Sequence, residues 1–143
     1  MEETELRDQK PILLVEDDVV DMLSVKRALR DLNVTNHLYH VENGEEALAF
    51  LRDEKNEMPA IILLDINMPK MNGLEFLDIV KKDDALRRIP VIVLTTSRAE
   101  IDKFQSFNLG VAGYMIKPVD YQQFVEVMRA ISVYWTLSEI PSH

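Results

Sequence analysis

The chain has 143 residues, about the length of one domain, and its 47% hydrophobic and 29% charged residues are ordinary for a folded globular protein. The 25 Asp and Glu residues outnumber 16 Lys and Arg, and the resulting net charge of −9 disfavours binding to nucleic acids and to anionic membrane surfaces. Four glycines leave no room for a glycine-rich phosphate loop, and the lack of cysteine excludes disulfides, thiolate nucleophiles and cysteine-ligated zinc.

Five short apolar runs predict β-strands along the chain. They span residues 12–15, 38–41, 60–64, 91–94 and 114–116, and the second is weaker because it contains His40. Unbroken runs rich in Ile, Leu and Val are typical of parallel strands that are buried on both faces. Parallel strands need connections of about a dozen residues or more, so we expect a helix in each gap.

Apolar residues at spacings of three and four predict these helices, and Asn43 and Ser97, each followed three positions later by Glu, are suited to cap two of them. The expected helices run from Met22 to Leu32, onward from Asn43 and from Gly73, from Ser97 to near Gly110, and onward from Asp120. Alternating strands and helices predict an α/β fold, a doubly wound parallel sheet with helices on both faces. We expect one domain over residues 1–143, with a core of about 11–133 between a short polar N-terminal and an aromatic C-terminal extension.

Polar residues suited to chemistry follow four of the five predicted strands. They are Glu16-Asp17-Asp18, Asp65, Thr95-Thr96-Ser97 and Lys117-Pro118. The carboxyl ends of parallel strands share one edge of the sheet, and doubly wound sheets bind their ligands there. We therefore expect these residues to converge on a single site.

A cluster of carboxylates at this edge needs a positive charge beside it. Two unit charges about 4 Å apart repel by roughly 4 kcal/mol at an effective dielectric constant near 20. Lys117 supplies one positive charge, and an all-oxygen donor set without His or Cys is typical of a hard divalent cation, Mg²⁺ first and Mn²⁺ as the alternative. Asp18 suits the positive start of a helix better than a metal site, and we expect His37 and His40 to lie away from the acidic edge.

Together, four segments resemble the receiver domains of two-component response regulators. They are ILLVEDD at 12–18, LLDINMPKMNG at 63–73, PVIVLT at 90–95 and GYMIKP at 113–118. Within that family, RRIP at 87–90, LTTS at 94–97 and the aromatic tail are similar to the single-domain receivers that partner bacterial phytochrome-type histidine kinases. The resemblance implies a flavodoxin-like fold of five β/α units with strand order 2-1-3-4-5.

The resemblance also implies roles for individual residues. Asp65 would accept a phosphoryl group from a phosphohistidine of a partner kinase, and Thr95 and Lys117 would contact the phosphoryl oxygens. The metal would be held by Glu16, Asp17, Asp65 and the main-chain carbonyl of Asn67. The peptide bond between Lys117 and Pro118 would be cis, as in the family.

Signalling in such receivers would pass through a change of the face made by the fourth helix, the fifth strand and the fifth helix. Thr95 and Tyr114 are the expected switch residues. The last helix is apolar on two sides, which favours a homodimer. The expected interface residues are Tyr121, Phe124, Met128, Tyr134 and Trp135.

The sequence thus predicts a stand-alone cytoplasmic receiver, because it contains no targeting segment and no run long enough to span a bilayer. Its partners would be a histidine kinase or phosphotransfer protein, phytochrome-linked by resemblance, and a downstream protein. Beyond its own phosphorylation and dephosphorylation it would not be an enzyme. Two alternatives remain at this point: a magnesium-dependent phosphatase with an aspartate nucleophile, and a scaffold that does not use phosphorylation.

Overall fold

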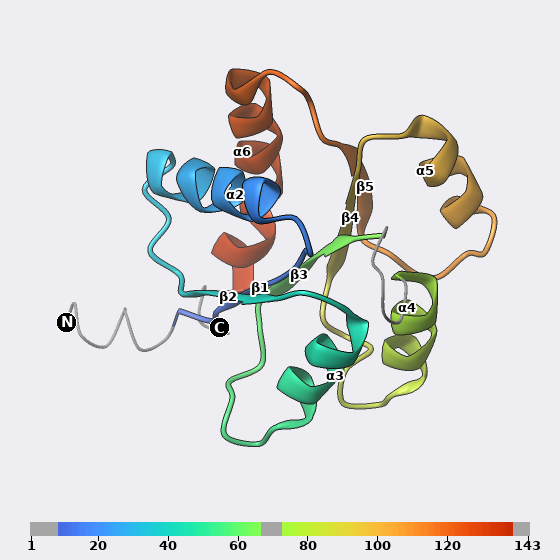
Figure 1. Ribbon diagram of the computed structural model, residues 1–143. Helices are drawn as coiled ribbons and strands as arrows, with labels where there is room; N and C mark the ends of the chain where they lie inside the picture. The colour runs from blue at the N-terminus through green and yellow to red at the C-terminus, as the bar shows by residue number, and fades with distance from the viewer. Residues whose placement is uncertain (1–8, 67–72, 139–143) are drawn as a thin grey trace.

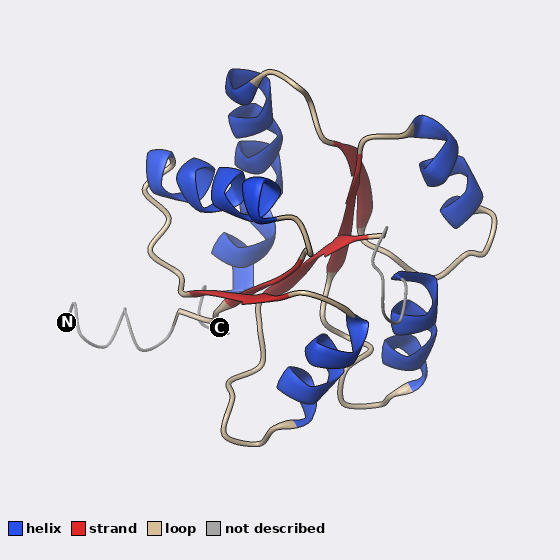
Figure 2. Ribbon diagram, viewed as in Figure 1, coloured by secondary structure: helices blue, strands red, loops and turns tan. Residues whose placement is uncertain are grey.

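A twisted sheet of parallel strands forms the centre of the molecule (Figures 1 and 2). The computed structural model describes residues 9–66 and 73–138, with side chains only as far as 132 at the C-terminal end. The strands are β1 (Ile12–Val15), β2 (Leu38–Val41), β3 (Ile61–Asp65), β4 (Val91–Thr95) and β5 (Gly113–Ile116). Their order in the sheet is β2-β1-β3-β4-β5, which confirms the predicted topology.

Helices cover both faces of the sheet (Figure 2). They are α2 (Val19–Asp31), α3 (Gly44–Arg52), α4 (Gly73–Lys82), α5 (Arg98–Gln105) and α6 (Tyr121–Ser138). The helices α2 and α6 lie on one face, while α3, α4 and α5 lie on the other (Figure 1). No helix in the described part of the chain combines the length and the apolar character needed to cross a bilayer.

Alternate residues of each inner strand belong to two separate hydrophobic clusters. In β1, Ile12 and Leu14 pack with side chains of α2 and α6, whereas Leu13 and Val15 pack with side chains of α3 and α4. All four side chains are at most 1% exposed. Because successive strand residues point to opposite faces and both faces are covered, the strand has no position for a polar residue until it ends.

Side-chain caps set the helix starts. The Asn43 side chain accepts a hydrogen bond of 2.9 Å from the Glu46 N–H, and Ser97 accepts one of 3.3 Å from the Glu100 N–H, which confirms both predicted starts. The helix α5, however, ends at Gln105 and does not continue to near Gly110. Asn108, with φ of 50°, takes a left-handed conformation that an α-helix cannot contain.

Candidate functional site

Three carboxylates meet at the carboxyl edge of the sheet. Glu16 directly follows β1, and Asp65 ends β3, whose Leu64 is paired with Val15 of β1. Together with Asp17, they offer oxygen atoms that all lie within 4.8 Å of one another. Glu16 and Asp65 are buried, at 2% and 8% exposure, while Asp17 is exposed. The structure therefore brings together the three predicted acidic side chains, whereas Asn67 lies outside the described residues.

This donor set fits a hard divalent cation. It consists of carboxylate oxygens from two neighbouring strand ends, without sulfur or imidazole, which matches the ligands of Mg²⁺ and Mn²⁺. One exposed and two buried carboxylates leave an approach for the ion from solvent on the Asp17 side. Within the described residues, Glu16, Asp17 and Asp65 are the side chains placed to hold a metal ion.

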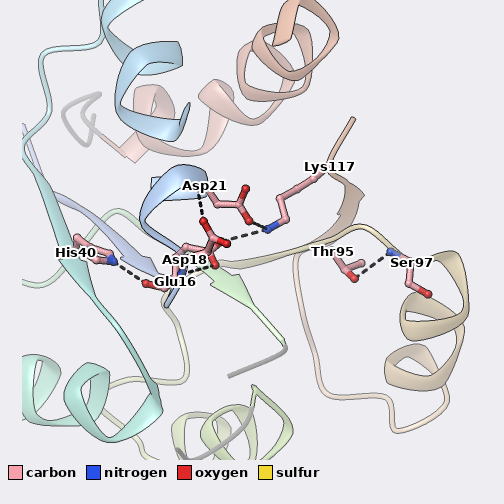
Figure 3. A network of polar contacts seen from close by, with 7 residues as sticks. All are labelled: Glu16, Asp18, Asp21, His40, Thr95, Ser97 and Lys117. Atoms are coloured by element: carbon pink, nitrogen blue, oxygen red, sulfur yellow. Dashed lines mark hydrogen bonds and ion pairs between the residues drawn. The ribbon is translucent and has the colours of Figure 1, made fainter. Parts of the chain in front are cut away.

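Lys117 reaches the same edge from the end of β5 (Figure 3). Its backbone N–H donates a 2.7 Å hydrogen bond to the Thr95 carbonyl, which continues the pairing of β4 with β5. Its ammonium Nζ lies 3.2 Å from Oε1 of Glu16 and 2.9 Å from Oδ2 of Asp21. The lysine side chain is only 11% exposed, so its charge acts in a place largely shielded from water.

Asp21 is a site residue that the sequence reasoning missed. It lies in the first turn of α2, where its N–H donates a 3.0 Å hydrogen bond to Oδ1 of Asp18. Asp18 is thus the N-cap of α2, as predicted (Figure 3). The signal that could have found Asp21 is its spacing: a carboxylate three residues after a helix cap stands in the turn that follows the end of β1.

Burial and charge shift the pKa values of Glu16 and Lys117. Burial, together with a hydrogen bond to Asp65, raises the pKa of Glu16 to about 8, although the positive charge of Lys117 opposes this rise. Burial on its own would lower the pKa of Lys117. The hydrogen bond with Asp21 and the negative charges of Glu16 and Asp65 outweigh it, and the pKa of Lys117 is raised. The lysine is therefore a permanent cation at neutral pH.

Thr95 is the last residue of β4 and is 1% exposed. Its Oγ1 accepts a 3.2 Å hydrogen bond from the Ser97 N–H (Figure 3). This bond ties the hydroxyl to the loop that starts α5, because Ser97 is the N-cap of that helix. Thr95 therefore joins the strand edge to a helix of the predicted signalling face.

Gly73 begins α4 close to the residue that follows Asp65. A Cβ atom at Gly73 would lie 3.0 Å from the Cα of Ile66, a tighter contact than nearly all real Cβ atoms make, so the backbone at Ile66 would have to give slightly. The lack of a side chain at residue 73 therefore lets the start of α4 approach the end of β3 without this crowding.

Two expectations near the site are wrong. His40 was expected away from the acidic edge, yet its Nε2 lies 2.6 Å from the main-chain oxygen of Glu16 (Figure 3). The register explains this contact: His40 is paired with Leu14, and its ring reaches the main chain two residues further on, just past the end of β1. The peptide bond between Lys117 and Pro118 is not cis, since the described residues contain no cis peptide. The lysine is directed to the edge by the backbone hydrogen bond of β5 instead.

The predicted interface residues of the last helix differ in their surroundings. Phe124 and Met128 are 5% and 0% exposed and pack inside the domain with α2 and the sheet, so their assignment to a dimer interface is wrong. Tyr121 faces α2, where its hydroxyl donates a 2.6 Å hydrogen bond to Asp31 and its ring lies 4.1 Å below the guanidinium of Arg27. The side chains of the other two, Tyr134 and Trp135, lie outside the described part.

The second predicted switch residue, Tyr114, is half-buried in β5. Its side chain packs against the cluster formed with α3, α4 and α5, and burial raises the pKa of its phenol. His37, in contrast, is exposed, and its ring lies 4.3 Å from that of Tyr39. Its surface position is as predicted.

Comparison with known proteins places the chain in one family. Residues 12–129 match the response regulator receiver domain. The response regulator Rcp1 of Synechocystis sp. strain PCC 6803 is 37% identical over 130 residues, which cover 88% of both chains. The phosphorylated cyanobacterial phytochrome response regulator RcpA has a TM-score of 0.80 and 39% identity, covering 90% of this chain and 94% of RcpA. The Mn²⁺-bound form of Rcp1 has a TM-score of 0.77 and 37% identity over 88% of this chain and 94% of that structure. The chain therefore belongs to the response regulator receiver domains, and within them it is similar to single-domain phytochrome response regulators.

Proposed function

We propose that this protein is a stand-alone cytoplasmic receiver whose Asp65 accepts a phosphoryl group from a histidine kinase or phosphotransfer protein. The observation that carries the proposal is the position of Asp65: buried at the end of β3, in one cluster with Glu16 and Asp17. Relatives matched over 88% and 94% of their own length support a receiver that acts without an attached output domain.

In the reaction, a carboxylate oxygen of Asp65 attacks phosphorus. An oxygen–phosphorus bond forms while the bond from phosphorus to the donor imidazole nitrogen breaks, and its electron pair stays on that nitrogen, which takes up a proton. Lys117 supplies a fixed positive charge near the phosphoryl oxygens, and the Thr95 hydroxyl supplies a hydrogen bond. Such transfers depend on positioning and charge stabilisation more than on a general base, and this edge offers both.

Glu16, Asp17 and Asp65, with the main-chain carbonyl of Asn67, would hold Mg²⁺ or Mn²⁺ here. When bound, the ion supplies the positive charge that lets a phosphoryl group enter a cluster of carboxylates. The Mn²⁺-bound form of the similar protein Rcp1 supports this assignment. The donor set of this chain supports it independently, since all three side chains present oxygen ligands.

The donor would dock on apolar residues beside the acidic edge. Val20 of α2 and Val119, which precedes α6, are 71% and 105% exposed, and both line a hollow of about 310 Å³ with Asp21 and Lys117. Exposed valines beside a buried lysine and a reactive carboxylate suit a protein partner more than a small substrate. The phytochrome response regulators similar to this chain support a phytochrome-type kinase as that partner.

Output would pass through the face made by α5, β5 and α6. Thr95 connects the acidic edge to the start of α5, and Tyr114 lines a hollow of about 540 Å³ with Arg98 and Ile101 of that helix. Phosphorylation would favour one of two packings of this face, with Thr95 and Tyr114 as the switch residues and a downstream protein or a second copy as the reader.

Incubation with acetyl phosphate and Mg²⁺, followed by mass spectrometry of the intact protein, tests the proposal. We expect one phosphoryl group per chain, and none in the Asp65→Asn variant. Continuous release of phosphate without stable labelling would identify a phosphatase, and no labelling at all would identify a scaffold; either result contradicts the proposal.

Homodimerisation through the α5–β5–α6 face has a separate test. Sedimentation velocity is compared with and without a phosphoryl analogue such as beryllofluoride. A dimer in either state would support the assembly, and a monomeric mass in both states would rule it out without affecting the phosphorylation chemistry.

A further inference from the structure

We propose that Asp21 is a positioning residue for the phosphorylation of Asp65, and that it holds the ammonium of Lys117 at the acidic edge during the transfer. The inference rests on the proposed function, since it assigns a role within that reaction. Its basis is the ion pair of 2.9 Å between Lys117 Nζ and Asp21 Oδ2, which is shorter than the 3.2 Å contact of the same ammonium with Glu16 (Figure 3).

The backbone holds Asp21 in place for this contact. Asp18 caps α2 by accepting the N–H of Asp21, so the first turn of the helix is fixed directly after the end of β1. The Asp21 carboxylate is 42% exposed and stands in the first turn of α2, at the positive end of the helix dipole. It therefore contacts the lysine without the cost of full burial.

Lys117 needs a second anchor because its stem is flexible. A lysine side chain has many accessible rotamers, and one carboxylate leaves its ammonium free to pivot. Glu16 and Asp21 hold the ammonium from two different elements, the end of β1 and the first turn of α2. Among the described residues, the close carboxylate group contains Glu16 and not Asp21. Asp21 thus keeps its oxygens for the lysine when Glu16 serves a metal ion.

The Lys117 ammonium has enough N–H donors to contact a phosphoryl oxygen while it stays bonded to Asp21. An ammonium group has three N–H donors, and the contacts with Glu16 and Asp21 use two of them. The third would donate to a phosphoryl oxygen. Positioning predicts that loss of Asp21 slows labelling of Asp65. If Asp21 instead competed with the phosphoryl group for the lysine, its loss would accelerate labelling.

The test compares the initial labelling rates of wild type, Asp21→Asn and Asp21→Glu with acetyl phosphate at saturating Mg²⁺. We expect Asp21→Asn to label roughly tenfold more slowly, as a misplaced catalytic group requires, and Asp21→Glu to recover most of the rate. The Mg²⁺ dissociation constant and the melting temperature should stay at their wild-type values. The matched control is Asp78→Asn, which removes an exposed carboxylate paired with Lys82 at 3.1 Å on α4.

A double-mutant comparison separates positioning from a general effect of charge. In a Lys117→Met background, the Asp21→Asn change should cause no further loss, because the group it positions is gone. A second measurement does not depend on that variant: the ¹⁵N resonance of the Lys117 ammonium should shift in Asp21→Asn and not in Asp78→Asn. Labelling of Asp21→Asn at or above the wild-type rate, while wild type is labelled on Asp65, overturns the inference alone. Failure of wild type to label overturns the proposed function as well.

Discussion

The ammonium of Lys117 donates a 3.2 Å hydrogen bond to Oε1 of Glu16, and in this pair the carboxyl group is 2% exposed and the ammonium 11% exposed. The pair joins β5 to β1 across the central strands of the sheet, between residues that lie 101 positions apart in the chain. A buried pair of this kind stabilises a fold only when both partners are fully satisfied. Here the carboxyl also accepts a 3.3 Å hydrogen bond from the Asp18 N–H.

Replacing the buried acid should change how the stability of the metal-free protein depends on pH. The pKa of Glu16 is raised from 4.5 to about 8, so between these values the folded protein keeps a proton that the unfolded chain has lost. Stability from this group is therefore present below about pH 4.5 and is lost as the pH rises toward 8. Glu16→Gln cannot ionise. We therefore expect the difference in unfolding free energy between Glu16→Gln and wild type to grow in favour of the variant by a few kcal/mol as the pH is raised from about 5 to about 9.

Urea unfolding in EDTA at the two pH values measures this difference. Glu45→Gln is the control, since it removes an exposed first-turn carboxylate of α3. A constant difference between Glu16→Gln and wild type at both pH values would show that Glu16 is already ionised in the metal-free protein.

Removing Asp17 should separate metal binding from folding. Its side chain is exposed, so Asp17→Asn should change the unfolding free energy in EDTA by less than about 0.5 kcal/mol. Its carboxylate is one of three in the cluster, and we expect the Mg²⁺ affinity to fall at least roughly tenfold with its loss. Titration calorimetry measures the affinity.

The adjacent Asp18 provides the matched control for that variant. Asn caps a helix as well as Asp does, so Asp18→Asn should leave both stability and Mg²⁺ affinity unchanged. If Asp18→Asn weakened metal binding as much as Asp17→Asn, the assignment of Asp17 as the ligand would fail.

The elements and the acidic edge could be predicted because each depends on a local pattern. The buried strands are unbroken apolar runs. The first polar residue that follows such a run therefore marks the edge of the sheet. Glu16 and Asp65 were found in this way. The topology brings the two residues together, because β1 and β3 are adjacent parallel strands that pair along the whole length of β1.

The contacts that were missed depend on reach and register across the fold. Asp21 meets Lys117 across 96 residues, and His40 meets Glu16 only because β2 and β1 pair in one register. The apolar stripes of the last helix were visible, but the pattern did not show that the domain's own sheet and α2 cover Phe124 and Met128. Packing between elements decides these points, and a single sequence does not encode it in any short pattern.

A methyl group at Gly73 should destabilise the protein and disturb the acidic edge. The added Cβ would lie 3.0 Å from the Cα of Ile66, which is backbone and directly follows Asp65. We expect Gly73→Ala to cost about 1–3 kcal/mol of unfolding free energy and to slow labelling of Asp65. Gly113→Ala is the comparison, because its Cβ would meet only the terminal Cδ1 atom of Ile92, at 3.1 Å. Equal costs for the two variants would contradict the special role of Gly73.

Truncating Met128 should destabilise the fold of each chain without changing how the chains associate. The side chain is fully buried between α6, α2 and the sheet, so Met128→Ala leaves a cavity and should cost about 2–5 kcal/mol of unfolding free energy. Urea unfolding measures the cost, and sedimentation velocity at a temperature where the variant remains folded should give the wild-type mass distribution. Gln122→Ala, on the exposed side of the same helix, should stay within about 0.5 kcal/mol of wild type. If Met128→Ala changed the association state with little change in stability, Met128 would belong to an interface between chains and not to the core.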